Sequence, residues 1–187
     1  MKNYQITSFV HHFLEDHIQP GDICIDATMG NGNDTVLLSK LVGERGRVTA
    51  FDIQQMALDN TKEKLQKEDC PNNYELVLAS HETMGNYAKE NTVSCITFNL
   101  GYLPGGDHAK ATQGGSSIRA IETGLRLLKK KGLITVCIYS GGDSGFEEKD
   151  AVLSHIKSLD AKKYLVIVAE YANRPNNPPI PVLIVKM

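Results

Sequence analysis

Features that would indicate a membrane, secreted or metal-binding protein are missing from this sequence of 187 residues. No apolar run approaches the ~20 residues that span a bilayer, and the N-terminus lacks the basic and then apolar segments of a secretion signal. The four cysteines form no CxxC pair, which favours buried, reduced thiols over disulfides or a zinc site. We therefore expect a cytoplasmic protein that binds no metal and contacts no membrane.

An excess of positive charge is missing as well. The formal net charge is −2, which argues against a chain that coats nucleic acid nonspecifically. The lysines at 129–131 leave a local basic face open as an interpretation, although such a run is also typical of a solvated helix C-terminus. With 41% hydrophobic residues, the chain is long enough for a single domain over residues 1–187, with a leading helix over 1–19.

The hydrophobic pattern predicts an α/β fold, because strand and helix signals alternate along the chain. Short apolar runs predict strands at 23–26, 48–52, 75–79, 93–98 and 133–139. Helical spacing predicts helices at 4–18, from 36 onward, and at 55–68, 116–129 and 146–159. Two more strands, 163–171 and 181–186, are joined by a proline-rich segment that is not helical, so they should pair antiparallel. The expected fold is a mostly parallel sheet with an antiparallel C-terminal hairpin and helices on both faces.

The stretch from Ile23 to Asp34 joins a buried strand to a helix through a turn that contains Gly30 and Gly32. This geometry brings a ligand close to bare backbone at a helix N-terminus. A P-loop would have Lys and Ser/Thr after the last glycine, and a dinucleotide fingerprint would have a third glycine where Thr35 stands. The turn instead carries polar residues and no cation: Asp26, Asn31, Asn33 and Asp34. A cationic ligand such as S-adenosylmethionine suits it best, although a plain turn capped by Asn and Asp has the same pattern.

Two further strand ends carry residues that suit a nucleoside. Asp52 closes the second strand roughly twenty residues past the glycines, where a carboxylate accepts hydrogen bonds from ribose hydroxyls, and Gln54 can reach the same sugar or the base. Ser80 and His81 follow the third strand, where an adenine edge would lie. Each has a structural alternative, since Asp52 and Ser80 also suit helix caps and His81 suits a solvated first turn.

The fourth strand runs into the segment from Asn99 to Asp107 and then into a glycine-rich loop that ends near Gly115. Connections between a strand and a helix usually take about 2–6 residues, and longer loops are usually functional. We therefore expect residues 100–115 to form a substrate loop.

These motifs together resemble class I S-adenosylmethionine-dependent methyltransferases with a Rossmann-like fold. More narrowly, they resemble a small bacterial family labelled as rRNA methylases, whose better-defined members methylate the aminomethyl group of 5-aminomethyl-2-thiouridine at the wobble position of tRNA. The matching segments are 26–32, 51–54, 80–81, 98–107 and 177–179. One departure is the segment 140–143, Ser-Gly-Gly-Asp, where the family usually has a His-Gly-His-Pro-like loop.

The resemblance implies a seven-stranded sheet with one antiparallel strand and a tRNA substrate, bound at its anticodon loop. It also implies S-adenosyl-L-methionine as the cofactor, with S-adenosylhomocysteine (SAH) as the product. Taken with the turn and the strand ends, it gives these expected cofactor-binding residues: Asp26, Gly30, Asn31, Asn33, Asp52, Gln54, Ser80 and His81.

A methyl group on a sulfonium is already activated, so the protein has mainly to align the attacking atom with the methyl carbon and the sulfur. The side-chain oxygen of Asn99 and the carbonyl of Leu100 are expected to accept the N–H bonds of a neutral amine, as in the Asn-Pro-Pro-Tyr motif of amino-methylating enzymes. Tyr102 is expected to stack on a splayed base, and Asp107 to hold the aminomethyl group or take its proton. A strand-end turn, core packing and a turn cap are the respective structural alternatives.

Other functions stay open from the sequence alone. Ribosomal RNA or a small molecule are alternative methyl acceptors. An NAD-dependent oxidoreductase shares the first strand–helix–strand unit but not the Asn99 segment, and a non-catalytic RNA-binding module would keep the same fold. A homodimer is expected, because one small domain offers little surface for a folded RNA.

Overall fold

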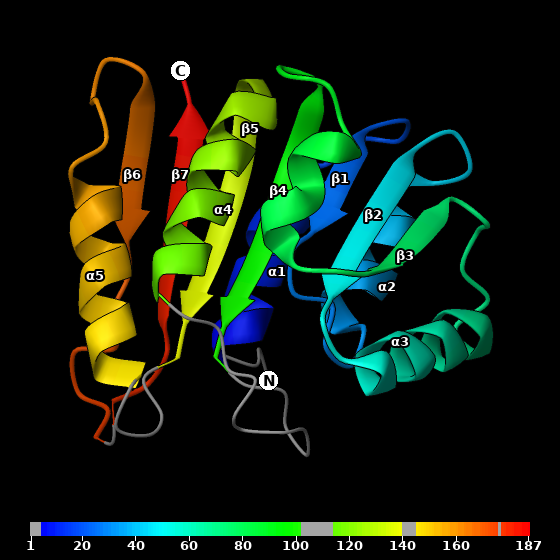
Figure 1. Ribbon diagram of the computed structural model, residues 1–187, viewed down its shortest axis with the longest axis horizontal. Helices are drawn as coiled ribbons and strands as arrows, with labels where there is room; N and C mark the ends of the chain where they lie inside the picture. The colour runs from blue at the N-terminus through cyan, green and yellow to red at the C-terminus, as the bar shows by residue number, and fades with distance from the viewer. Residues whose placement is uncertain (1–4, 102–113, 140–144, 176) are drawn as a thin grey trace.

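The structure, a computed structural model, describes residues 5–101, 114–139, 145–175 and 177–187. Its strands are β1 (Ile23–Asp26), β2 (Arg47–Asp52), β3 (Tyr74–Leu78), β4 (Val93–Leu100), β5 (Leu128–Ile138), β6 (Tyr164–Val168) and β7 (Ile180–Lys186). Its helices are α1 (Ile6–His17), α2 (Asn33–Val42), α3 (Gln55–Lys67), α4 (Gly114–Leu127), α5 (Gly145–Lys157) and the 3₁₀ helix η1 (His81–Asn86). Strands and helices alternate from α1 to β6, as the hydrophobic pattern predicts (Figure 1).

The described strands form one seven-stranded sheet in the order β3-β2-β1-β4-β5-β7-β6. Strand β7 is antiparallel to both of its neighbours, β5 and β6, whereas the pairs among β1 to β5 are parallel. In such a doubly wound sheet the strand order reverses beside β1, and ligands bind outside the carboxyl ends of the strands at that point. The predicted mostly parallel sheet with an antiparallel C-terminal hairpin is confirmed.

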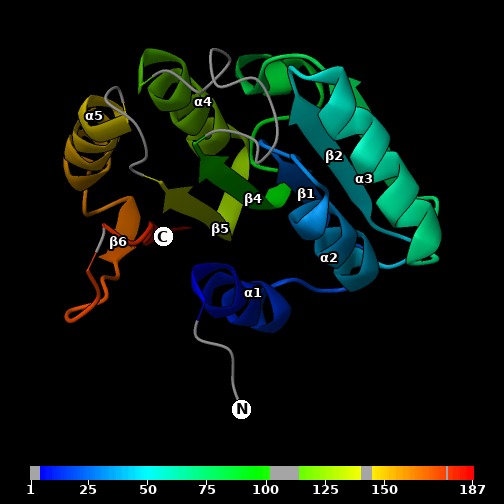
Figure 2. The ribbon, with the colours of Figure 1, turned by 90° about the horizontal axis from the view of Figure 1, so that it is seen from below.

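Helices cover both faces of the sheet (Figure 2). On one face, α4, α5 and η1 bury apolar side chains that include Ile121, Val152 and Met84. On the other face, α1 and α2 pack through Leu14 and Leu38, and α3 lies beside α2. Each fully buried side chain of this size contributes about 1.5–3 kcal/mol, so the two layers hold the strand ends firmly in place. No helix within the described ranges has the length and apolar character that crossing a membrane requires.

The lysine run at 129–131 lies at the start of β5, so the prediction of a helix C-terminus there is wrong. Helix α4 ends at Leu127, and segments far away in the sequence bind its last carbonyls. The N–H groups of Asn91 and Thr92 donate to the carbonyls of Arg126 and Leu127 at 3.1 and 3.0 Å. Because these partners precede β4, the local sequence around the lysines does not reveal where the helix stops.

The carboxyl ends of the parallel strands meet at one edge of the sheet, which Figure 2 views from below. Strand β4 continues to Leu100, beyond its predicted end at residue 98, so Asn99 belongs to the strand itself. Its neighbour β1 ends at Asp26, where the glycine turn begins. The edge therefore brings the turn and Asn99 together.

Candidate active site

The glycine turn between β1 and α2 needs backbone conformations that glycine adopts without strain. Gly30 and Gly32 have φ angles of 51° and 76°. A Cβ atom on Gly32 would lie 2.9 Å from Oγ1 and 3.0 Å from Cα of Thr61 on α3. Thr61 also donates a hydrogen bond through Oγ1 to the carbonyl of Gly30 at 3.1 Å. The turn is thus pressed against α3, and a side chain at residue 32 would not fit there without a shift of the turn or the helix.

Asp26 lies inside this turn, with no exposed surface. Its carboxylate accepts hydrogen bonds from Thr35 Oγ1 at 2.6 Å, from the Thr28 N–H at 3.2 Å and from Thr97 Oγ1 at 3.4 Å. Burial and, less strongly, the nearby Asp34 carboxylate raise the pKa of Asp26, the threonine donors lower it, and the net pKa is about 7. These bonds shape the turn; a contact between Asp26 and a cofactor stays a prediction.

Asp52 connects the end of β2 to the glycine turn. Its Oδ2 accepts the Gly30 N–H at 3.1 Å, and its Oδ1 accepts the Gln54 N–H at 3.0 Å. Gln54 is itself the N-cap residue of α3, and no side chain among the described residues caps that helix, so the helix-cap alternative for Asp52 is wrong. A carboxylate has about four acceptor positions, so two remain for the hydroxyls of a ribose.

Exposed apolar side chains flank Asp52, and sequence reasoning missed them. Ile53 follows Asp52 in the sequence and is 50% exposed. Leu78, which lies opposite Asp52 in the pairing of β2 with β3, is 49% exposed. Apolar surface beside a polar strand end suits the flat face of a nucleobase. The signal in the sequence was the isoleucine directly after a strand-ending acid.

Ser80 caps η1, as its structural alternative predicts, because its Oγ accepts the Glu82 N–H at 3.3 Å. His81 is buried, so the alternative of a solvated first-turn residue is wrong. Its Nδ1 lies 3.2 Å from the carbonyl oxygen of Ala27, which only accepts hydrogen bonds, so Nδ1 carries the proton. Burial lowers the pKa of His81 and favours the neutral ring. Nε2 is then an acceptor, and it has no partner among the residues that the structure describes.

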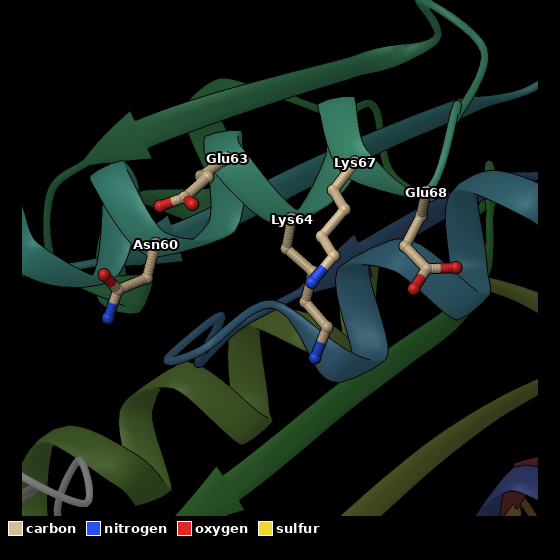
Figure 3. A pocket seen from close by; sticks show the side chains of 5 residues that line it. All are labelled: Asn60, Glu63, Lys64, Lys67 and Glu68. Carbon is tan, nitrogen blue, oxygen red and sulfur yellow. The ribbon is translucent and has the colours of Figure 1, made fainter.

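Asn31 and Asn33 connect the turn to α3. The Oδ1 atom of Asn31 accepts a hydrogen bond from Asn60 Nδ2 at 3.0 Å, and that of Asn33 accepts one from Lys64 Nζ. The two donors belong to a polar pocket on the surface of α3 that faces α2 (Figure 3). Its lining residues are Asn60, Glu63, Lys64, Lys67 and Glu68. In this arrangement the two asparagines stabilise the entry into α2.

Asn99 is bound at two points by residues of the glycine turn and α2. Its backbone N–H donates to Thr28 Oγ1 at 2.6 Å, and its side-chain Nδ2 donates to Asp34 Oδ2 at 2.8 Å. The other oxygen of Asp34 lies 2.7 Å from His11 Nε2 on α1. Sequence reasoning named Asp34 only as a polar residue of the glycine turn and did not predict its bond to Asn99. It did not include His11 in the site, because helix α1 precedes β4 by many residues.

The other predicted parts of the methyl-acceptor site are less complete. The Leu100 carbonyl, the second expected acceptor, already accepts the Tyr139 N–H at 2.9 Å as part of the pairing of β4 with β5. Tyr102 and Asp107 lie outside the described residues, as does most of the loop at 100–115. No group of three or more His, Cys, Asp or Glu side chains in the described part of the chain is arranged to hold a metal ion.

The doubly wound sheet, with its antiparallel β7 and a glycine turn lined by acids, defines a Rossmann-like class I methyltransferase. The chain belongs to the family described as "Putative rRNA methylase", whose model matches residues 48–185. The resemblance found in the sequence is therefore confirmed, and an oxidoreductase is not supported.

Solved structures agree over the whole chain. An rRNA methylase of this description from Clostridium thermocellum is 42% identical, with a TM-score of 0.95 and 100% of both chains covered. A methyltransferase from Streptococcus mutans, solved in complex with SAH, is 38% identical, with a TM-score of 0.89 and 99% of both chains covered. The chain is also 35% identical over 184 residues to the chloroplastic tRNA (mnm(5)s(2)U34)-methyltransferase of Arabidopsis thaliana. That match covers 92% of this chain but only 66% of the length of the Arabidopsis protein.

Proposed function

We propose that this chain is an S-adenosyl-L-methionine-dependent N-methyltransferase that methylates the aminomethyl group of 5-aminomethyl-2-thiouridine at the wobble position of tRNA. The Arabidopsis relative supports the substrate, since its name specifies the methylated product of this nucleotide. The Streptococcus mutans relative supports the cofactor, because SAH is what remains of S-adenosylmethionine after methyl transfer.

The orientation of the Asn99 side chain is the observation that carries this proposal. An ionised carboxylate only accepts hydrogen bonds, so the NH₂ group of the Asn99 amide must face Asp34, as it does at 2.8 Å. The amide oxygen is then directed away from Asp34 and serves as an acceptor. A primary amine that donates an N–H to this oxygen can aim its lone pair at a methyl group above the glycine turn.

The reaction needs no further group to activate the methyl donor. The lone pair of the neutral amine forms the new N–C bond while the C–S bond breaks, which leaves SAH and a secondary ammonium that releases its proton. In this proposal Asp52 binds the ribose, and Gly30 and its neighbours in the turn bind the methionine part. Ile53 and Leu78 flank the adenine, whose edge meets the His81 region.

Two predicted catalytic residues complete the proposal. Tyr102 stacks on the base that the anticodon loop splays out, and Asp107 holds the aminomethyl group or accepts its proton. The enzyme acts in the cytoplasm, and a homodimer provides enough surface for the tRNA.

The direct test uses tRNA from cells that lack this gene, incubated with the purified protein and labelled S-adenosylmethionine. Mass spectrometry of the nucleosides should show 5-aminomethyl-2-thiouridine converted to its N-methyl derivative. Ribosomal RNA from the same cells is the parallel substrate, chosen because the family description names rRNA. Methylation of rRNA without methylation of tRNA would refute the proposed substrate.

The Asn99→Ala variant tests the mechanism. Loss of the amide oxygen should lower kcat by about 100-fold, the cost of a badly positioned reactant, while the affinity for SAH stays nearly unchanged. Asn72→Ala is a matched control, because Asn72 is exposed and lies before β3 at the opposite edge of the sheet. A kcat for Asn99→Ala within a few-fold of wild type would remove Asn99 from the mechanism.

A further inference from the structure

On the basis of the proposed function, we infer that Asp34 and His11 are positioning residues that fix the orientation of the Asn99 amide for methyl transfer. Three elements from different parts of the chain meet here: α1 contributes His11, α2 contributes Asp34 and β4 contributes Asn99. None of the expected cofactor contacts uses either residue.

The hydrogen bonds of Asp34 leave each of its carboxylate oxygens with one donor. Oδ1 lies 2.7 Å from His11 Nε2, and Oδ2 lies 2.8 Å from Asn99 Nδ2. Asp34 is only 8% exposed, so a donor that is lost to mutation is replaced by water only in part. Its place in the first turn of α2 adds the favourable field of a helix N-terminus for a negative charge.

This arrangement allows only one orientation of the Asn99 amide. With the amide rotated by half a turn, its oxygen would face the Asp34 carboxylate, and two acceptors would be left in contact without a proton between them. The NH₂ group would then face the substrate amine, which donates rather than accepts at that point. Asp34 therefore selects the orientation in which the amide oxygen is available to the amine.

The backbone of Asn99 is fixed by the same segment of the chain. Thr28 Oγ1 accepts its N–H at 2.6 Å, and Thr28 and Asp34 lie on the two sides of the glycine turn. The turn that is proposed to bind the methyl donor and the amide that is proposed to bind the methyl acceptor are therefore connected directly. Their relative position is fixed by the hydrogen bonds from Asn99 to Thr28 and to Asp34.

His11 holds the other side of Asp34. Helix α1 is itself fixed to the sheet, because Val10 and Leu14 are buried in the core beneath it. The position of the His11 ring is therefore set by packing, and its Nε2 gives Asp34 a donor on the side away from Asn99. Without this donor, Asp34 can turn toward solvent and release the amide. The leading helix thus contributes to the active site.

The experiment measures kcat, with saturating tRNA and S-adenosylmethionine, for variants of the full chain. Asp34→Asn offers an NH₂ group or an oxygen to Asn99, so both amide orientations become allowed. We expect kcat to fall by about 10- to 100-fold, as for a displaced reacting group, with the Kd for SAH within about threefold of wild type. A merely structural role would lower SAH affinity and thermal stability in step with the rate.

His11 gives a second test that does not depend on the folding of Asp34→Asn. His11→Ala should lower kcat by about tenfold, whereas His11→Gln, whose Nε2 reaches a similar place and also donates, should restore most of the rate. His12→Ala is the matched control, because His12 is the next residue of α1 and its side chain is 59% exposed. Its kcat should equal that of wild type.

The outcomes separate this inference from the proposed function. Wild-type protein that fails to methylate the tRNA would overturn the proposed function and, with it, the roles of Asp34 and His11. Active wild-type protein with an unchanged kcat in Asp34→Asn or His11→Ala would overturn this inference alone. Equal rates for His11→Ala and His11→Gln, both well below wild type, would also overturn it, since donation by residue 11 would not matter.

Discussion

Replacing Gly32 by alanine tests whether the contact between the glycine turn and α3 shapes the cofactor site. The substitution places a Cβ 2.9 Å from Thr61 Oγ1, closer than such atoms normally approach, at a residue with a φ of 76°. The left-handed conformation costs about 1–2 kcal/mol for a residue other than glycine. The added volume costs about 1–3 kcal/mol more, because the turn or α3 must move.

The expected loss is therefore about 2–5 kcal/mol of unfolding free energy, or a fall in Tm of roughly 4–20 °C at about 2–4 °C per kcal/mol. The turn carries the Gly30 N–H and carbonyl, which bind Asp52 and Thr61, so its displacement should also weaken SAH binding. Calorimetry should show at least a tenfold higher Kd, equivalent to about 1.4 kcal/mol. Denaturant melts give the stability.

Gly43→Ala is the matched control at the other end of the same helix. Gly43 has a φ of 62°, but a Cβ there would meet nothing within 4 Å. This variant should therefore lose stability through strain alone, about 1–3 kcal/mol, and keep its affinity for SAH. The reasoning would be refuted if Gly32→Ala bound SAH as tightly as wild type, or if Gly43→Ala lost as much affinity.

Two further predictions concern the acids of the site. Asp52→Ala removes the acceptor of the Gly30 and Gln54 N–H groups as well as the proposed ribose contact, so calorimetry should show SAH binding weakened at least about tenfold; an unchanged Kd would contradict this role. The pKa of Asp26 is raised to about 7, mainly by burial. Between roughly pH 4 and 7 the Asp26 carboxyl therefore keeps its proton in the folded protein but has lost it in the unfolded chain. Because the folded state binds the extra proton, the free energy of unfolding falls as pH rises through that window. Asp26→Asn should lack this contribution: in denaturant melts, wild type should lose at least about 1.4 kcal/mol relative to the variant between pH 4 and pH 8, the value of one pKa unit. Parallel pH profiles for the two proteins would show that Asp26 does not titrate in this way.

The fold was predictable from the sequence because its signals are local. Apolar runs marked the strands, and the proline-rich segment before β7 excluded a helix and so predicted the antiparallel pair. The boundaries that failed depend on distant partners. The end of α4 is set by N–H groups of Asn91 and Thr92, and no pattern around the lysines at 129–131 contains that information.

The same distinction applies to the site. Asn99 and Asp52 were predicted as site residues because each stands at or near a strand end, and parallel strands bring those ends together. The pairing of Asn99 with Asp34 joins residues 65 positions apart, and the His11 contact adds a helix that the pattern only showed to be amphipathic. The burial of His81 follows from a short 3₁₀ helix, for which the sequence offers no periodic signal.

The place of β7 within the sheet has a consequence for synthesis on the ribosome. Strand β6 pairs only with β7 in the described sheet, and β5 has β7 as its partner on the side away from β4. The strands beside the glycine turn, β1 to β4, are all made once residue 100 has emerged, whereas β5 keeps an open edge until residues 180–186 follow. The half that is proposed to bind the cofactor can thus assemble early during translation. Until β7 is inserted, the nascent chain carries an unpaired edge on β5 that is exposed to chaperones or to aggregation.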